Sequence, residues 1–111
     1  MKRGDVVYAN LDPTLGSETQ KTRPVLIVSN DAANRAAALV TVLPLTSNVS
    51  KVFPFEVKLL ASDTGLPKDS KAMAQQVRSL DKRRLAKTVS GHVPVLLMTA
   101  IDAALRLHLG L

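Results

Sequence analysis

The sequence feature that most constrains the fold is the unbroken apolar run VLIV at positions 25–28, which follows a polar segment and precedes a Ser-Asn-Asp turn. Four consecutive apolar residues between turn signals indicate a strand that is covered on both faces. Pro24 has no N–H group for a ladder, so we expect it at the first position of this strand. Arg23 then lies where the polar loop 16–22 joins a rigid strand, and its guanidinium can reach a ligand.

The remaining apolar segments are short and separated by turn residues, which predicts a small mostly-β domain. We expect further strands at residues 5–11, 39–43, 53–59, 71–80 and 89–93, with Pro44 ending the third strand. A short helix capped by Asp31 is expected at 34–38, a helical turn at 81–85, and a terminal helix from Pro94 to about Leu109. The chain is predicted to be one domain, 1–111, built as a strongly bent β-barrel with short helices and a C-terminal helix.

The terminal helix is apolar nearly all round, because only Thr99, Asp102 and Arg106 form a polar stripe. A helix with so narrow a polar stripe should be buried on more than one side. One side can face the sheet of the same chain, and the other needs a second chain. The strand at 25–28 makes the same demand, so we expect a homodimer.

Composition restricts the class of protein and of partner. The chain has no cysteine, which removes disulfides and thiolate metal sites and fits a cytoplasmic protein. No apolar segment is long enough to span a bilayer, and no signal peptide is visible, so no membrane association is expected. Fifteen Lys and Arg against nine acids give a net charge of +6, which favours a nucleic acid or an acidic protein as partner. Basic charge that only aids solubility is the alternative.

The residues argue against several kinds of active site. His92 and His108 are far apart in the sequence and lack the spacing of a metal site, so no metal and no cofactor is expected. A two-histidine acid–base scheme would need both imidazoles in one cleft. Glycine-rich nucleotide loops and the G-x-S-x-G motif of serine hydrolases are also missing from the sequence.

Polar residues at the ends of the predicted strands offer another kind of chemistry. Consecutive strands usually pair, which would bring Arg23 and Thr46 together at one edge. An arginine and a hydroxyl can bind a phosphate, and Glu18 could accept a proton or orient the arginine. The alternative for Thr46 and Asn48 is ordinary turn chemistry, in which such side chains cap their own backbone.

Four segments, in this order and spacing, resemble the MazF/PemK family of toxin endoribonucleases from type II toxin–antitoxin systems. They are RGDVVYANLDPTLGSE, TRPVLIVSND, PLTSN with KVFPFEV, and DSKAMAQQVRSLDKRRL. The resemblance implies a small SH3-like barrel that forms a homodimer. It also implies sequence-specific, metal-independent cleavage of single-stranded RNA to 2′,3′-cyclic phosphate and 5′-hydroxyl ends, and neutralisation by a cognate antitoxin protein.

The resemblance also implies roles for particular residues. Arg23 of the R-P-V motif and Thr46 after the third strand match the family's catalytic residues, and Glu18 matches a residue that assists in some members. The loops 17–22 and 47–51 match the segments that select the RNA sequence. The RNA-binding residues expected on this basis are Ser17, Gln20, Lys21, Ser47, Asn48, Lys51, Gln76 and Arg78.

Some relatives of the PemK kind use an Asp two residues after an Arg in the late strand. This chain has Leu80 at that offset from Arg78, which favours an Arg–Thr catalytic scheme over an Arg–Asp–His scheme.

Two other functions are open on the sequence. The same barrel could instead carry a protein-targeting toxin, such as a gyrase poison, whose activity lies in its terminal residues. It could also be a catalytically silent RNA-binding module.

Overall fold

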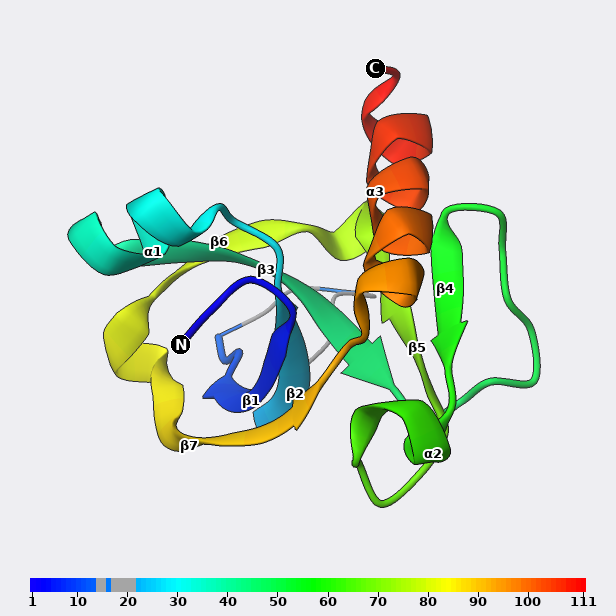
Figure 1. Ribbon diagram of the computed structural model, residues 1–111, viewed down its shortest axis with the longest axis horizontal. Helices are drawn as coiled ribbons and strands as arrows, with labels where there is room; N and C mark the ends of the chain where they lie inside the picture. The colour runs from blue at the N-terminus through cyan, green and yellow to red at the C-terminus, as the bar shows by residue number, and fades with distance from the viewer. Residues whose placement is uncertain (14–15, 17–21) are drawn as a thin grey trace.

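The computed structural model describes residues 1–13, 16 and 22–111, and they form a curved antiparallel sheet with helices at its margins (Figure 1). The strands are β1 (Asp5–Asn10), β2 (Thr22–Ile27), β3 (Leu39–Thr46), β4 (Glu56–Leu59), β5 (Ser70–Met73), β6 (Arg78–Asp81) and β7 (Leu85–His92). The helices are α1 (Asp31–Ala36), α2 (Ala61–Thr64) and α3 (Val95–Leu109), with 3₁₀ turns η1 (Ala74–Gln76) and η2 (Lys82–Arg84). The predicted mostly-β class with short helices and a C-terminal helix is confirmed. None of the helices in these ranges is long and apolar enough to cross a membrane.

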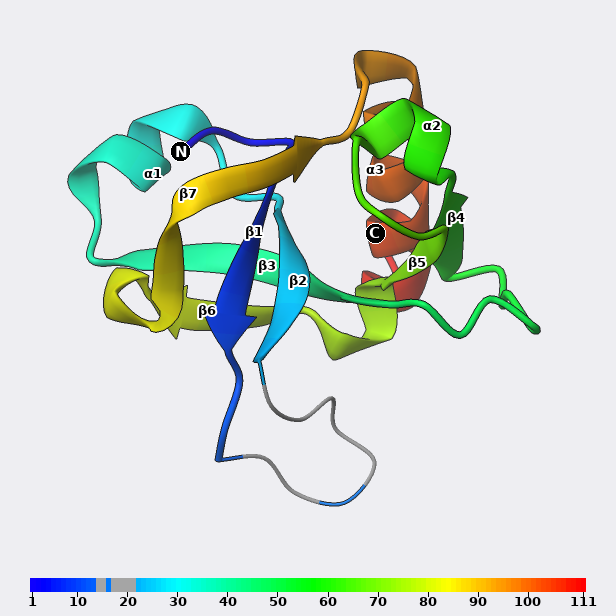
Figure 2. The same cartoon turned by 90° about the horizontal axis from the view of Figure 1, so that it is seen from below.

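The strand order is β4-β5-β3-β2-β1-β7, and β6 pairs with β3 on the same edge as β5. Figure 2 shows β1, β2 and β7 wrapping around one end of this sheet, with α3 at the other end. The described strands β4 and β7, at the two ends of the path, do not pair with one another. The predicted barrel is therefore an open, bent sheet.

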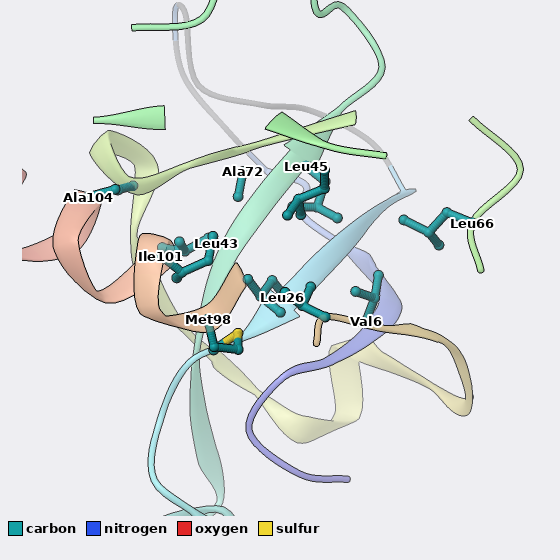
Figure 3. Packing of buried hydrophobic residues seen from close by; sticks show 12 residues of the cluster. Val6, Leu26, Leu43, Leu45, Leu66, Ala72, Met98, Ile101 and Ala104 are labelled. Carbon is teal, nitrogen blue, oxygen red and sulfur yellow. The ribbon is translucent and has the colours of Figure 1, made fainter. Parts of the chain in front are cut away.

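Side-chain alternation divides the interior into two apolar clusters on opposite faces of the sheet. Leu26 and Leu43 belong to the first cluster, where Met98 and Ile101 of α3 pack on the sheet (Figure 3). The second cluster lies on the opposite face and contains Val7, Ala9, Leu11, Val25, Ile27, Val40, Val42, Leu80 and Leu85. The prediction that β2 is covered on both faces is confirmed. The cover comes from the same chain, so this strand gives no reason of its own for a second chain.

Pro44 does not end the third strand, as predicted, but lies inside β3. On one edge of β3, Val42 pairs with Arg78 of β6 and Leu45 pairs with Ala72 of β5. Pro44 falls between these two ladders, where it has no partner on that edge. Its missing N–H therefore removes no hydrogen bond there, which explains why the strand continues.

Pro24 is also inside a strand, because β2 begins at Thr22 instead of at Pro24. It is paired with Tyr8 of β1, but the ladder to β3 starts one residue later, at Val25. The proline therefore occupies a position where β2 has one neighbouring strand, as expected for a residue that cannot donate.

The single strand predicted for residues 71–80 is wrong, because the segment forms β5, η1 and β6. Both strands pair with the same edge of β3, but their registers differ. Between the pairs Ala72–Leu45 and Arg78–Val42 the late segment advances six residues while β3 advances three. The three extra residues leave the ladder as the 3₁₀ turn η1.

Other boundaries differ by a few residues. Helix α1 begins at Asp31 and is capped by Asn30, whose side chain accepts a hydrogen bond from the Ala33 N–H at 2.8 Å. The prediction had Asp31 as the cap and placed the helix at 34–38. Strand β4 begins at Glu56 instead of Phe53, β7 is longer than predicted, and α2 was not predicted. The helical turn at 81–85 and the terminal helix are confirmed.

A substitution at Gly91 tests how closely α2 packs on β7. A Cβ atom at this position would lie 2.7 Å from the backbone oxygen of Thr64. We expect Gly91→Ala to lower the free energy of unfolding by about 1–3 kcal/mol, measured by urea denaturation, because the added methyl overpacks this contact. The exposed neighbour Ser90 is the control, and Ser90→Ala should stay within about 0.5 kcal/mol of wild type. Unchanged stability of Gly91→Ala would contradict this packing.

Candidate functional site

The ends of β2 and β3 bring two of the predicted site residues to the same face of the sheet. The last pair of the β2–β3 ladder is Val25 with Pro44, and continuing this register sets Arg23 opposite Thr46. Opposed residues of an antiparallel pair project to the same face. This face is the one that carries Val25 and Val42, so Arg23 and Thr46 continue it beyond the second apolar cluster.

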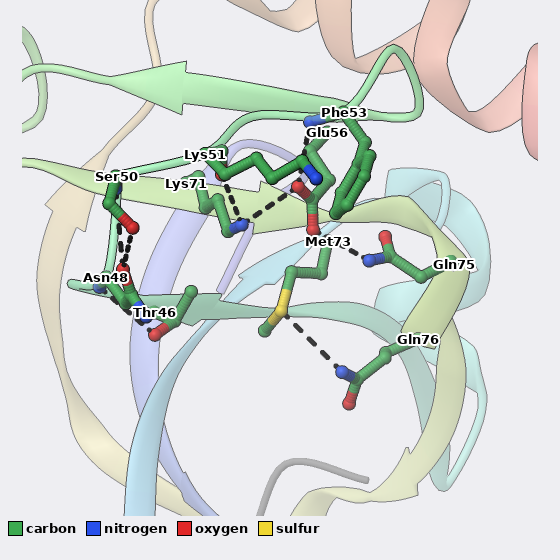
Figure 4. Close-up of polar contacts among 10 residues, drawn as sticks. All are labelled: Thr46, Asn48, Ser50, Lys51, Phe53, Glu56, Lys71, Met73, Gln75 and Gln76. Carbon is green, nitrogen blue, oxygen red and sulfur yellow. Dashed lines mark hydrogen bonds and ion pairs between the residues drawn. The ribbon is translucent and has the colours of Figure 1, made fainter. Parts of the chain in front are cut away.

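Strands β4 and β5 extend this face away from Arg23. Thr46 pairs with Lys71 of β5, and Lys71 pairs with Lys58 of β4. Figure 4 shows the side chains of Thr46, Lys71 and Met73 on the same side of these strands, with Gln76 beside Met73. The face therefore contains a hydroxyl, a buried ammonium group and an amide from neighbouring segments.

The start of the β3–β4 loop is held by its own side chains. The Asn48 N–H donates to Thr46 Oγ1 at 3.3 Å, and the Ser50 N–H donates to Asn48 Oδ1 at 3.4 Å. The Ser50 hydroxyl also donates to Asn48 Oδ1, at 2.8 Å. The alternative that these residues cap their own backbone is thus confirmed for their acceptor oxygens. In these contacts Thr46 and Asn48 act as acceptors, so their hydroxyl and amide hydrogens are not used in the hydrogen bonds of the described loop.

Gln76 and Arg78 lie beside this face but also make internal contacts. Gln76 Nε2 is 3.6 Å from Met73 Sδ, and Arg78 Nη1 donates to the Leu11 backbone oxygen at 3.3 Å. Arg78 is opposite Val42 in the β3–β6 ladder, which places it on the face of Thr46. Its guanidinium thus connects β6 to the segment that follows β1.

A buried polar cluster behind the β3–β4 loop was missed by the sequence analysis. Lys71 Nζ lies 2.9 Å from Glu56 Oε1, and Gln75 Nε2 donates to Glu56 Oε2 at 2.7 Å (Figure 4). Burial raises the pKa of Glu56, but hydrogen bonds from the Phe53 N–H, Gln75 and Lys71 outweigh it and hold the pKa below its usual value. Alternation placed Glu56 on the polar face of its strand, but no sequence signal indicated its partner fifteen residues away.

Arg23 and Ser47 also border a cavity of about 260 Å³ at the end of the sheet. Its other lining residues are Tyr8, Thr22, Pro24, Leu45, Leu66, Pro67, Lys68 and Ser70. Leu45 belongs to the first apolar cluster, on the face opposite that of Thr46. The cavity therefore adjoins the Arg23–Thr46 face at the sheet edge without being part of it.

The predicted residues Ser17, Glu18, Gln20 and Lys21 lie outside the described residues. Lys51 is exposed, and its Nζ lies 4.8 Å from the centre of the Phe53 ring. His92 is the last residue of β7, and His108 lies in the last turn of α3. Almost the whole length of α3 separates them, so they do not share a cleft. His92 Nδ1 is 3.0 Å from Asp5 Oδ1, at the pairing of β1 with β7.

The lowered pKa of Glu56 predicts a pH-dependent contribution to stability. Because the folded-state pKa is below the ordinary value of 4.5, the contribution is present above pH 4.5 and is lost as the pH falls through the folded-state pKa. Glu56→Gln should unfold at lower urea concentration than wild type at pH 7, and this difference should narrow below pH 4.5. Urea denaturation of both proteins across this range is the measurement. A difference that is the same at every pH would contradict the assignment.

Over its whole length, the chain is similar to known proteins of one family. A family model described as PemK-like, MazF-like toxin of type II toxin–antitoxin system matches residues 2–109. Endoribonuclease MazF9 of Mycobacterium tuberculosis (strain ATCC 25618 / H37Rv) is 45% identical over 116 residues, covering 100% of this chain and 98% of that protein. Endoribonuclease EndoA of Bacillus subtilis (strain 168) is 37% identical over 112 residues, covering 100% of this chain and 96% of that protein.

Solved structures agree with these relationships. MazF from Deinococcus radiodurans superposes with a TM-score of 0.85 at 31% identity, covering 100% of this chain and 97% of that one. An endoribonuclease from a mycobacterial species, solved in complex with its cognate antitoxin, superposes with a TM-score of 0.82 at 32% identity, covering 100% and 96%.

Proposed function

Because the chain belongs to the PemK/MazF family of type II toxin–antitoxin toxins, we propose that it is a sequence-specific endoribonuclease that cuts single-stranded RNA without a metal ion. The observation that carries this proposal is the register of β2 and β3, which, continued beyond its last pair Val25–Pro44, sets Arg23 opposite Thr46 on a basic chain. Two full-length relatives, at 45% and 37% identity, are named endoribonucleases. The products are a 2′,3′-cyclic phosphate and a 5′-hydroxyl end.

This reaction has three requirements. The 2′-hydroxyl must lose a proton, the negative charge of the phosphorane must be stabilised, and the 5′-oxygen must gain a proton. The Arg23 guanidinium meets the second requirement, since an arginine stays protonated and offers a fork of donors to phosphate oxygens. The Thr46 hydroxyl donates to a non-bridging oxygen. Glu18, outside the described residues, is the candidate base.

RNA recognition combines cationic and hydrogen-bonding groups around this pair. Lysine and arginine side chains neutralise phosphates, and donors such as the Asn48 amide hydrogen-bond to splayed bases. Phe53 and Phe55 stack on each other with ring centroids 5.4 Å apart, and the sequence has one further aromatic residue, a tyrosine, so there is little aromatic surface for base stacking. Sequence preference therefore comes from loop hydrogen bonds, with Ser47, Lys51, Gln76 and Arg78 as contributors.

The assembly we propose is a cytoplasmic homodimer that is neutralised by a cognate antitoxin. Leu96 and Leu107 of α3 are 86% and 57% exposed, and the exposed Ala100 and Ala103 lie on the same side of the helix. A second copy that covers this face would bury it. The mycobacterial relative was solved with its antitoxin, and the net charge of +6 suits an acidic partner.

Substitution of the proposed catalytic pair tests the activity. Arg23→Ala and Thr46→Ala should each lower the cleavage rate by about 10²–10³-fold, because each removes a donor to the transition state. The assay is digestion of a mixed RNA in EDTA, followed by mapping of the cut positions and their ends. Arg35→Ala is the control, since Arg35 is an exposed arginine on α1.

The outcomes of this digest separate the alternatives. Cuts centred on a short motif with 5′-hydroxyl ends support the nuclease. Inhibition of gyrase without RNA cuts would instead identify a protein-targeting toxin, and RNA binding without cuts a silent module. Near-wild-type cleavage by Arg23→Ala would remove Arg23 from the mechanism.

The dimer is tested by placing a charge on the exposed face of α3. Ala103→Glu should convert the dimer to a monomer in sedimentation velocity, because a carboxylate buried at the interface has no partner there. Ala32→Glu adds the same charge to an exposed position of α1 and should leave the dimer intact. Equal sedimentation of wild type and Ala103→Glu would show that this face is not the interface.

A further inference from the structure

The cluster formed by Glu56 and Lys71 lies next to the proposed catalytic face but has no place in the mechanism above. The two side chains are only 2% and 11% exposed, and their charged atoms are 2.9 Å apart. Lys71 is the β5 residue that pairs with Thr46, so its side chain projects to the same face. The ion pair is therefore beside the reacting groups, although it is shielded from solvent.

The cluster binds the backbone of the β3–β4 loop at two points. Lys71 Nζ donates to the backbone oxygen of Lys51 at 2.6 Å, and Glu56 Oε1 accepts from the Phe53 N–H at 3.0 Å. Gln75 occupies the other carboxylate oxygen of Glu56, at 2.7 Å. The two bonded backbone atoms belong to the segment 47–55, which contains no helix or strand.

The loop held in this way carries groups that the proposed function assigns to RNA. Asn48 and Lys51 lie on it, and Lys51 is itself one of the anchored residues. The Lys71 ammonium is 5.8 Å from the centre of the Phe53 ring, and the Lys51 ammonium is 4.8 Å from it. Anchoring at Lys51 and Phe53 therefore sets where the Lys51 side chain leaves the loop.

Stability alone does not account for a buried ion pair. Replacing such a pair by apolar side chains of similar volume is often neutral or stabilising, because both charges lose their hydration on burial. What apolar side chains cannot provide is directed hydrogen bonds to the backbone of an irregular loop. The cluster therefore has an effect on loop geometry that an apolar replacement would lack.

We propose that Glu56 and Lys71 are positioning residues that hold the β3–β4 loop in the course needed to bind and select RNA. This inference rests on the proposed endoribonuclease function. The pair acts through Asn48 and Lys51 and does not contact the scissile phosphate. Loss of the pair should weaken RNA binding and sequence preference much more than the chemical step.

The test uses the full chain with the double substitution Lys71→Met/Glu56→Leu, which replaces the ion pair without leaving one charge buried alone. The control is Lys87→Met, because Lys87 is an exposed lysine on β7, a strand that carries none of the proposed site residues. The substrate is a short single-stranded RNA with the motif mapped for wild type, together with versions that carry one changed base. For each protein the midpoint of thermal unfolding, kcat and KM are measured.

We expect the double variant to fold. Its KM should rise about 10–100-fold, which corresponds to the loss of one or two charged hydrogen bonds, and its kcat should change less than about threefold. Its preference for the mapped motif over the changed versions should fall, while Lys87→Met should match wild type. A folded double variant with wild-type KM and preference would overturn the inference. So would an equal loss in kcat and kcat/KM, which would place the pair in the chemical step.

Hydrogen exchange of the Phe53 amide gives a readout that does not depend on RNA. This N–H should be protected in wild type and in Lys87→Met and should exchange faster in the double variant. Unchanged protection would mean that the pair does not hold the loop. If wild type cuts no RNA, the proposed function fails, and the Phe53 amide still decides whether the loop is anchored.

Discussion

The structure depends on β3, a strand that has different neighbours along its two edges. One edge pairs with β2, and the other pairs first with β6 and then with β5. This arrangement allows one strand to close two apolar clusters, since Val42 faces one cluster and Leu43 the other. Because Thr46 is the last residue of β3, the proposed site lies at the end of the strand that is most restrained by its neighbours.

The elements that were predicted correctly are those with a strong local signal. The apolar run of β2, the terminal helix and the turn after Asp81 were recognisable from periodicity or composition alone. The errors arose where pairing in three dimensions decides the outcome. Pro44 reads as a strand end unless the two ladders on either side of it are known, and the η1 turn follows from a difference in register between β5 and β6.

The site shows the same division between local and distant information. That Arg23 and Thr46 lie on one face followed from the expectation that consecutive strands pair. The ion pair between Lys71 and Glu56 was not predicted, because each residue taken singly looks like a solvated charge on an alternating strand. Only the fold places them together, away from water, where a charged residue requires a partner.

The anchors of the β3–β4 loop are backbone atoms, the oxygen of Lys51 and the N–H of Phe53. Backbone groups are the same whatever side chain the residue carries. Side chains such as Asn48 can therefore be exchanged during evolution without disturbing the anchors. A frame of this kind would allow the side chains of this loop to change by a few substitutions while the contacts that hold its backbone stay the same.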